Sequence, residues 1–275
     1  MSLGKYILVN GSFITTDEYR ISLSESEAFL FSEKIRSVRT AFPFFRETLE
    51  IIKLKFRIFG HSFPDFTSND GAGLKRQLER TLTKNKHFLG AVFIIKFRFI
   101  QQKIQYSIQS EKLEETSYEL NEKGLYVETL DEIRKSTSSI SSLSIGSEVY
   151  WKIAENQQTN PLFDHFLIVN TEGLITEIPE SNIYLIKGNI VQGASSSQGA
   201  YQDISRPLML KIFRELGMKY TDDQGITFQN LKEAEEILSV NAIDGIRWIV
   251  GFEGKRYFNN SIRKISELFK QSVTS

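Results

Sequence analysis

A carboxylate and an amide stand in the middle of the most strand-like stretch of this chain. The sequence GLITEIPESNIYLIKGNIV, residues 173–191, alternates apolar and polar residues and predicts two β-hairpin arms. Glu177 and Asn182 lie between the arms, where a plain hairpin needs neither. A glutamate there can accept hydrogen bonds or hold a neighbouring positive charge. Taken alone, the pattern predicts that Glu177 is an exposed carboxylate on a strand, paired with a nearby base. Its role therefore has to be inferred from the surrounding elements.

The remaining composition excludes several kinds of chemistry. The chain has 275 residues and no cysteine, which excludes disulfides, thiolate metal sites and thiol nucleophiles. Three scattered histidines, His61, His87 and His165, leave little for a metal site or a Ser-His-Asp triad. Thirty-four basic residues balance thirty-four acidic ones, so we expect no nucleic-acid or membrane partner. Without a transmembrane or signal-peptide pattern, the expectation is a soluble, cytoplasmic protein.

The first 115 residues predict a small α+β domain. KYILVNGSFI indicates a hairpin that turns at Asn10-Gly11. A helical face over residues 47–60 ends at Gly60, and leucines repeat with helical spacing over residues 74–82. Residues 90–109 predict a long hairpin, and a polar stretch over 111–123 serves as a linker or a hairpin edge.

Residues 116–275 predict a larger α/β domain. The serine-rich run STSSISSLSIGS, residues 136–147, favours a solvated loop. EVYWKIAENQQ is typical of a helix, and HFLIVN of a buried strand. In DISRPLMLKIFRELG, Asp203 or Ser205 is expected at the N-cap, before Pro207 in the first turn. A helix, a strand, a loop and a hairpin follow, and a last amphipathic helix closes the chain, so strands and helices alternate.

The order of these elements resembles the class IV aminotransferases, the pyridoxal-phosphate (PLP) proteins of fold type IV. This family includes branched-chain and D-amino-acid aminotransferases and aminodeoxychorismate lyase. NTEGLITEIPESNIYLIKGNIV is similar to its signature segment, and DISRPLMLKIFRELGM to its phosphate-side helix. LVNGSFI and EAEEILSVNAIDGIRWI resemble its opening hairpin and its closing strand and loop. The resemblance implies a two-domain D-amino-acid aminotransferase-like fold and a homodimer with the cofactor site near the subunit interface.

The resemblance also assigns roles to residues. Glu177 matches the carboxylate that holds the pyridine nitrogen of PLP protonated, which makes the cofactor an electron sink. Asn182 matches the amide that fixes the following loop. The phosphate-binding positions, at a helix N-terminus and a second backbone patch, are matched by Ile204, Ser205, Asn241 and Ala242.

Three positions depart from the family pattern. The lysine that forms the imine with PLP is expected at about Ser144, and no lysine lies between Lys135 and Lys152. Lys152 is a weak substitute, two helical turns away. The early-helix arginine that binds the phosphate is missing, and Lys53 or Lys55 would lack its bidentate fork. Asp203 replaces a glycine before the phosphate-side helix and would repel a phosphate dianion.

Together the residues favour a divergent class IV aminotransferase-like or aminodeoxychorismate lyase-like protein, a pseudoenzyme with ordinary PLP binding lost or altered. The remaining pocket, which includes Ser144 and Glu177, would then bind another small molecule such as an amino acid or a related acid. One alternative is an active PLP-dependent aminotransferase or lyase. Another is a non-catalytic protein that binds a partner, which a pocket filled by side chains would favour over an open one.

Overall fold

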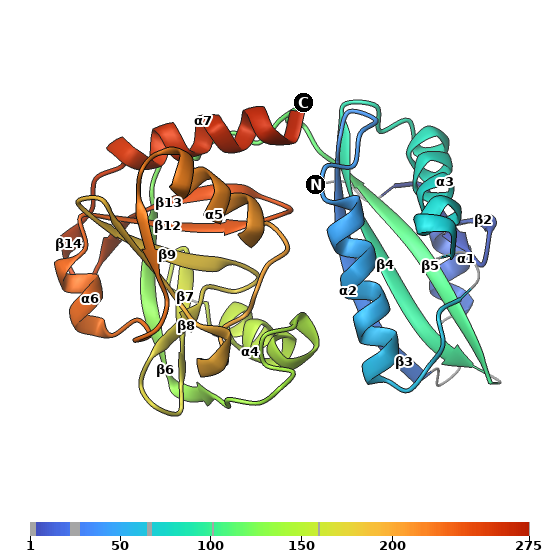
Figure 1. The fold of residues 1–275 in the computed structure, drawn as a ribbon. Helices are drawn as coiled ribbons and strands as arrows, with labels where there is room; N and C mark the ends of the chain where they lie inside the picture. Colours follow the sequence, from blue (N-terminus) through green and yellow to red (C-terminus); the bar gives the residue numbers. More distant parts are fainter. Residues whose placement is uncertain (1–3, 23–27, 65–67, 101, 159, 275) are drawn as a thin grey trace. The chain divides into compact units, whose positions relative to one another are not determined.

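The chain divides into two compact units, residues 1–117 and 118–273. The computed structural model describes residues 4–22, 28–64, 68–100, 102–158 and 160–274 (Figure 1). Within that part of the chain, no helix is long and apolar enough to cross a membrane. Each unit is built around its own sheet.

Unit 1 is an antiparallel sheet with strand order β2-β1-β5-β4-β3, on which α2 and α3 pack (Figure 1). Asn10 and Gly11 have positive φ angles of 46° and 89°, which fit the tight β1–β2 turn. The leucines over residues 74–82 are buried along one face of α3. The elements are β1 (Tyr6–Val9), β2 (Ser12–Thr15), α1 (Thr16–Ser22), β3 (Ala28–Val38), α2 (Phe45–Ile58), α3 (Ser68–Asn85), β4 (Gly90–Ile100) and β5 (Lys103–Lys112).

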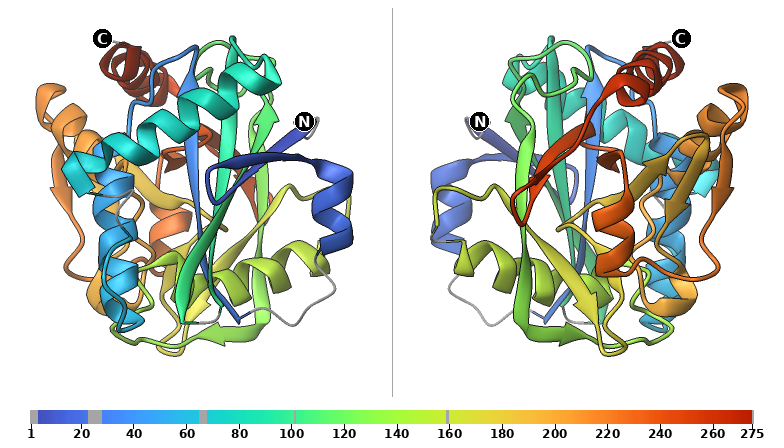
Figure 2. Two further views of the ribbon diagram at one scale, coloured as in Figure 1. Left: turned by 90° about the vertical axis from the view of Figure 1, so that its right-hand side faces the viewer. Right: turned by 90° about the vertical axis from the view of Figure 1, so that its left-hand side faces the viewer.

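Unit 2 is a mixed sheet with strand order β11-β10-β9-β12-β13-β6-β7-β8, and β14 pairs with β13. Both views of Figure 2 show α7 at the edge of this unit. Its strands are β6 (Leu125–Lys135), β7 (His165–Asn170), β8 (Ile175–Glu177), β9 (Asn182–Lys187), β10 (Ile190–Gly193), β11 (Lys219–Thr221), β12 (Glu236–Asn241), β13 (Gly245–Phe252) and β14 (Lys255–Arg256). Its helices are α4 (Ser144–Gln157), the short η2 (Ser196–Gln198), α5 (Arg206–Glu215), α6 (Phe228–Glu233) and α7 (Asn260–Thr274).

The prediction of two hairpin arms over residues 173–191 is wrong for the first arm. β8 pairs with β7, whereas β9 pairs with β10 and β12. Only an isolated bridge between Ile178 and Ser181 closes the loop that follows Glu177. The apolar alternation is the same for either partner, so it does not specify which strand β8 joins.

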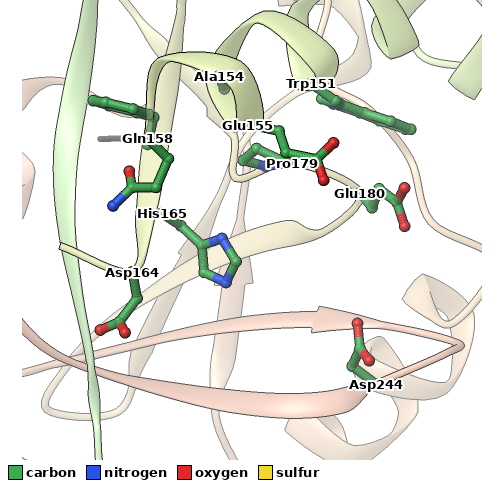
Figure 3. Close-up of a pocket in the computed structure, with 10 residues that line it drawn as sticks. Trp151, Ala154, Glu155, Gln158, Asp164, His165, Pro179, Glu180 and Asp244 are labelled. Carbon is green, nitrogen blue, oxygen red and sulfur yellow. The ribbon is translucent and has the colours of Figure 1, made fainter. Parts of the chain in front are cut away.

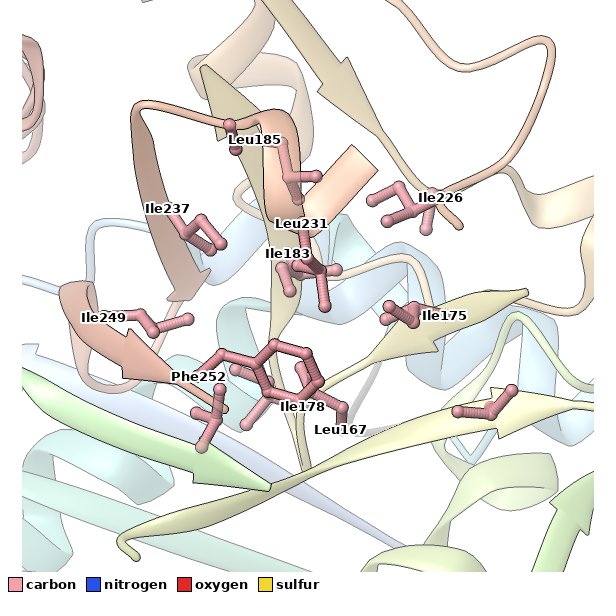
Figure 4. Close-up of a cluster of buried hydrophobic side chains, with 14 of the residues drawn as sticks. Leu167, Ile175, Ile178, Ile183, Leu185, Ile226, Leu231, Ile237, Ile249 and Phe252 are labelled. Atoms are coloured by element: carbon pink, nitrogen blue, oxygen red, sulfur yellow. The ribbon is translucent and has the colours of Figure 1, made fainter. Parts of the chain in front are cut away.

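One apolar cluster forms the core beneath this sheet (Figure 4). Ile175 of β8, Ile183 of β9 and Ile249 of β13 meet there, although β8 and β9 are far apart in the strand order. The sheet is therefore strongly curved. The opposite face of β9 is also buried, because Tyr184 packs edge-on against Phe213 of α5. This double burial explains the unbroken apolar run in β9.

The serine-rich run is only partly the loop that its composition predicts. Residues 136–143 connect β6 to α4, but the helix already begins at Ser144. Ser141 and Ser147 are buried, with 1% and 0% of their surface exposed. Ser141 Oγ donates to the Ser136 carbonyl at 2.8 Å, and Ser147 Oγ donates to the Ser141 carbonyl at 3.0 Å. These hydroxyls satisfy the backbone at the start of α4, which makes the run an ordered helix entrance.

Candidate cofactor-type site

Two opposite charges are buried at the ends of β6 and β8, the two strands that flank β7. Lys135 is the last residue of β6 and lies opposite Asn170 of β7. Glu177 is the last residue of β8 and lies opposite Ile168 on the other edge of β7. Both side chains are fully buried, and Lys135 Nζ lies 2.5 Å from Glu177 Oε2. The strand-end carboxylate thus has a basic partner, but the pair is buried rather than exposed.

Further donors complete the surroundings of this pair. Trp151 Nε1 donates to Glu177 Oε1 at 2.8 Å, and the Tyr201 backbone N–H donates to Oε2 at 2.7 Å. Lys135 Nζ also donates to Ser147 Oγ at 2.7 Å. Ser147 and Trp151 are four residues apart on α4, so one helix face supplies both contacts. Burial lowers the pKa of Lys135, and the attraction of Glu177 opposes this shift.

A second buried charge, Asp203, lies before α5. The Ser205 N–H donates to Asp203 Oδ1 at 2.8 Å, and the Tyr201 hydroxyl donates to Oδ2 at 3.3 Å. The Asp203 backbone N–H in turn donates to Asn182 Oδ1 at 3.1 Å. Burial raises the pKa of Asp203 to about 6, and the hydrogen bonds to its carboxylate partly oppose the rise. Tyr201 therefore connects both charged positions, with its backbone on Glu177 and its hydroxyl on Asp203.

Two asparagines hold the loops around these charges. Asn182 accepts from the backbone N–H of Asp203 at 3.1 Å and donates to the Tyr201 carbonyl. Asn241 Oδ1 accepts from two backbone N–H groups of the β12–β13 turn, and its Nδ2 donates to Ser181 Oγ at 2.9 Å. These bonds tie the loop after β8 to the segment before α5 and to the turn that carries Ala242.

An open cavity of about 380 Å³ lies beside Trp151 (Figure 3). Acidic side chains and one imidazole line it, and Glu177 does not. The charged and titratable lining residues are Glu155, Asp164, His165, Glu180 and Asp244. Among the described residues, no group of three or more such side chains could hold a metal ion. None of the residues that the sequence assigns to a cofactor lines this cavity, so the cavity is separate from them.

The structure brings together some of the predicted site residues. Asn182 and Ser205 both form hydrogen bonds with Asp203, and Glu177 is joined to the same segment through the Tyr201 N–H. Asn241 orders the turn beside Ala242. Ile204 is half-buried between Asp203 and Ser205.

Other predicted residues lie apart from the buried pair. Ser144 is the first residue of α4, and Ser147, one turn later, contacts Lys135 instead. Lys152 is exposed on α4. Lys53 pairs with Glu50 at 2.6 Å. Lys55 is buried in unit 1 and pairs there with Glu33.

The N-cap prediction for α5 is confirmed for Ser205, with Pro207 in the first turn. Ser205 holds the N-cap position but makes no side-chain capping bond. Asp203 accepts the Ser205 N–H at 2.8 Å and the Tyr201 hydroxyl at 3.3 Å. Its own N–H donates to Asn182 of β9, so the residue is tied to a distant segment that a local capping pattern does not reveal.

Sequence reasoning missed four residues that surround Glu177: Lys135, Ser147, Trp151 and Tyr201. Strand alternation gave one available signal for Lys135. Ile133 and Lys135 are two residues apart in EIRK, so their side chains share one face of the strand. A lysine on the apolar side of a strand end needs a buried partner. The sequence separation of 42 residues hid the identity of that partner.

Comparisons with known proteins agree with this architecture. The family model described as Amino-transferase class IV matches residues 68–251. A D-alanine aminotransferase from Bacillus licheniformis is 26% identical over 190 residues, which cover 66% of this chain and 62% of that protein. The chain thus spans somewhat less than two thirds of this curated relative.

Solved structures extend the likeness to both units. An aminotransferase from Brucella abortus, bound to the cofactor PLP, superimposes with a TM-score of 0.79 at 13% identity over 100% of both chains. A putative 4-amino-4-deoxychorismate lyase from Legionella pneumophila gives 0.73 at 19% identity, over 92% of this chain and 93% of the other. These similarities define the fold as that of the type IV PLP proteins. The chain belongs to the class IV aminotransferase family.

Proposed function

We propose that this chain is a non-catalytic member of its family, which folds and acts without PLP. The buried Lys135–Glu177 pair carries the proposal. A pyridinium nitrogen would have to take the place of the Lys135 ammonium group, because Glu177 already accepts hydrogen bonds from Lys135, Trp151 and Tyr201. The ammonium group of Lys135 supplies the positive charge that a protonated cofactor nitrogen would bring.

The phosphate end supports the same conclusion. The N–H group of Ser205, one of the positions where the resemblance puts the phosphate, already donates to the Asp203 carboxylate at 2.8 Å. A phosphate dianion at that place would meet a second buried negative charge. The lysines considered as substitutes for the missing arginine, Lys53 and Lys55, are held in ion pairs with Glu50 and Glu33. The residues present therefore do not fit PLP.

Small-molecule binding, if retained, would take place beside Trp151 rather than at Glu177. The side chains around Glu177 fill the space, which favours the non-catalytic interpretation over a ligand pocket. The cavity beside Trp151 offers about 380 Å³ of open space. Its four carboxylates disfavour the amino acid or related acid that the resemblance implies as a ligand. The homodimer also remains part of this proposal, and light scattering of the purified protein measures it.

The test is reconstitution with PLP followed by borohydride reduction and peptide mass mapping. We expect no retained visible absorption band after excess PLP is removed. Reduced adducts should be scattered over exposed lysines such as Lys152, at the same level in the wild type and in Lys135→Met. This matched variant lacks the only lysine that contacts Glu177 among the described residues.

A stoichiometric adduct on one lysine would contradict the proposal. If that adduct lay on Lys135 and vanished in Lys135→Met, the amine would leave Glu177 to form the imine. The chain would then be an active PLP-dependent aminotransferase or lyase. If the protein purified with PLP bound, that result would also contradict the proposal.

A further inference from the structure

One groove on the surface of unit 1 concentrates positive charge, although the formal net charge of the whole chain is zero. The groove has a volume of about 350 Å³ and lies between α3 and Phe13 of β2 (Figure 1). Its charged lining residues are three cations and one carboxylate: Arg76, Arg80, Lys84 and Glu79. We call it the basic groove. The balance of acidic and basic residues over the full sequence hides this local excess.

The three cations form one stripe along α3. Arg76, Arg80 and Lys84 are four residues apart, a spacing that puts side chains on the same face of a helix. At about 1.5 Å of rise per residue, the stripe is roughly 12 Å long. The buried leucines over residues 74–82 lie on the other side of α3, which contacts β1 and β5. The cations therefore stand on a packed helix, which keeps their spacing fixed.

Aromatic rings orient two of these cations. The guanidinium carbon of Arg80 lies 5.5 Å from the centroid of the Phe13 ring, and Lys84 Nζ lies 4.5 Å from that of Tyr6. Arg80 Nη1 also donates to the Gly11 carbonyl at 3.4 Å, in the β1–β2 turn. Both ring distances are in the range of cation–π attraction, which orients a cation without removing its charge.

No carboxylate neutralises the stripe. In the described part of the chain, none of its three cations forms an ion pair, and Glu79 pairs with neither arginine. Arg80 instead donates to the amide oxygen of Gln77 at 2.9 Å. Like charges four residues apart on a helix repel one another. The arrangement is therefore unfavourable by itself, and an anion bound along the stripe removes the repulsion.

We propose that the basic groove binds a small ligand with two or more phosphate groups in a row, either a free polyphosphate or a nucleoside polyphosphate. The planar fork of each arginine fits phosphate oxygens in a bidentate way. A stripe roughly 12 Å long exceeds what one phosphate can contact and suits a chain of them. The volume of the groove is typical of small-molecule sites. The inference goes beyond the proposed function, because none of the residues that the resemblance assigns to PLP lines the groove.

The test is calorimetric titration of the whole protein with sodium tripolyphosphate at about pH 7.5 and low salt. Arg80→Gln and Lys84→Gln should each weaken binding by about tenfold, because each removes a charge-assisted hydrogen bond. The matched control is Lys75→Gln, which removes an exposed cation of the same helix that does not line the groove. This control should leave the dissociation constant unchanged. Glu79→Gln removes the one carboxylate of the groove and should tighten binding by roughly threefold.

Adenosine triphosphate and inorganic phosphate are titrated in the same way. Equal dissociation constants for tripolyphosphate and adenosine triphosphate would mean that the groove recognises the phosphate chain alone. Tighter binding of adenosine triphosphate would mean that the groove also contacts the nucleoside, and either result supports the inference. Inorganic phosphate should bind at least about tenfold more weakly than tripolyphosphate, because it reaches fewer cations.

Three results would overturn the inference. One is the absence of tripolyphosphate binding, and another is an equal loss of affinity in Arg80→Gln and Lys75→Gln. The third is binding that both Arg80→Gln and Lys84→Gln leave intact, which would put the anion elsewhere in the chain. PLP mapping is a separate measurement, so a failure here leaves the PLP-free function standing.

Discussion

Lys135→Met should strongly destabilise unit 2. The substitution keeps an unbranched chain of similar length but leaves the Glu177 carboxylate buried without its counter-charge. Removing one partner of a buried pair costs about 3–5 kcal/mol. Trp151 and the Tyr201 backbone still donate to the carboxylate, so we expect the lower end, about 3 kcal/mol. That corresponds to a decrease in melting temperature of roughly 6–12 °C for a unit of this size.

A double-mutant cycle separates the pair from the cost of each substitution. Glu177→Gln also removes the charge, and Lys135→Met with Glu177→Gln leaves no uncompensated ion. The double variant should be about 2 kcal/mol more stable than the sum of the single effects predicts. Urea unfolding at neutral pH measures all four proteins, with Lys152→Met as the matched control for a lysine exposed on α4. A cost for Lys135→Met no larger than that of Lys152→Met, or strictly additive effects, would refute the reasoning.

Three further predictions concern unit 2. The folded pKa of Asp203, about 6, exceeds its unfolded value, so its contribution to stability is present below about pH 4 and is lost as pH rises to about 6. The unfolding free energy of Asp203→Asn relative to wild type should therefore rise by about 2 kcal/mol from pH 4.5 to 7.5, and a pH-independent difference in urea titrations would contradict this. Glu236 accepts two backbone N–H groups in the first turn of α7 at 3.0 Å, so Glu236→Ala should lower the unfolding free energy by about 1–2 kcal/mol. An unchanged unfolding free energy would show that this cap is unimportant. A Cβ on Gly146 would lie 2.3 Å from the carbonyl oxygen of Ile140, so Gly146→Ala should lower stability by about 1–3 kcal/mol, and wild-type stability would show that α4 can shift.

Much of the fold follows from local patterns in the sequence. The Asn10-Gly11 turn, the leucine face of α3 and the closing helix α7 lie where periodicity and turn chemistry predict them. These features depend on interactions between residues near each other in the chain. The pairing of β8 with β7 is also local, because a short turn over residues 171–174 joins the two strands. It was missed because the apolar alternation is the same whether β8 joins the strand before it or the strand after it.

The site was predicted only in part. Glu177 and Asn182 stood out because their residue types are unusual within a strand pattern. Lys135 did not, because a lysine at the end of a strand is ordinarily exposed, and its burial depends on Glu177 and Ser147 from distant segments. Asp203 stands out as unfavourable for phosphate, but its hydrogen bonds with Tyr201 and Asn182 depend on the folded segment before α5.

The central claim is that side chains of this chain occupy the place of the cofactor. A crystal structure of the wild-type protein, grown with saturating PLP, tests it most directly. The account predicts Lys135 Nζ within hydrogen-bonding distance of Glu177 and the Asp203 carboxylate against the Ser205 N–H. A pyridine ring against Glu177, with a phosphate at Ser205 and Ala242, would contradict it.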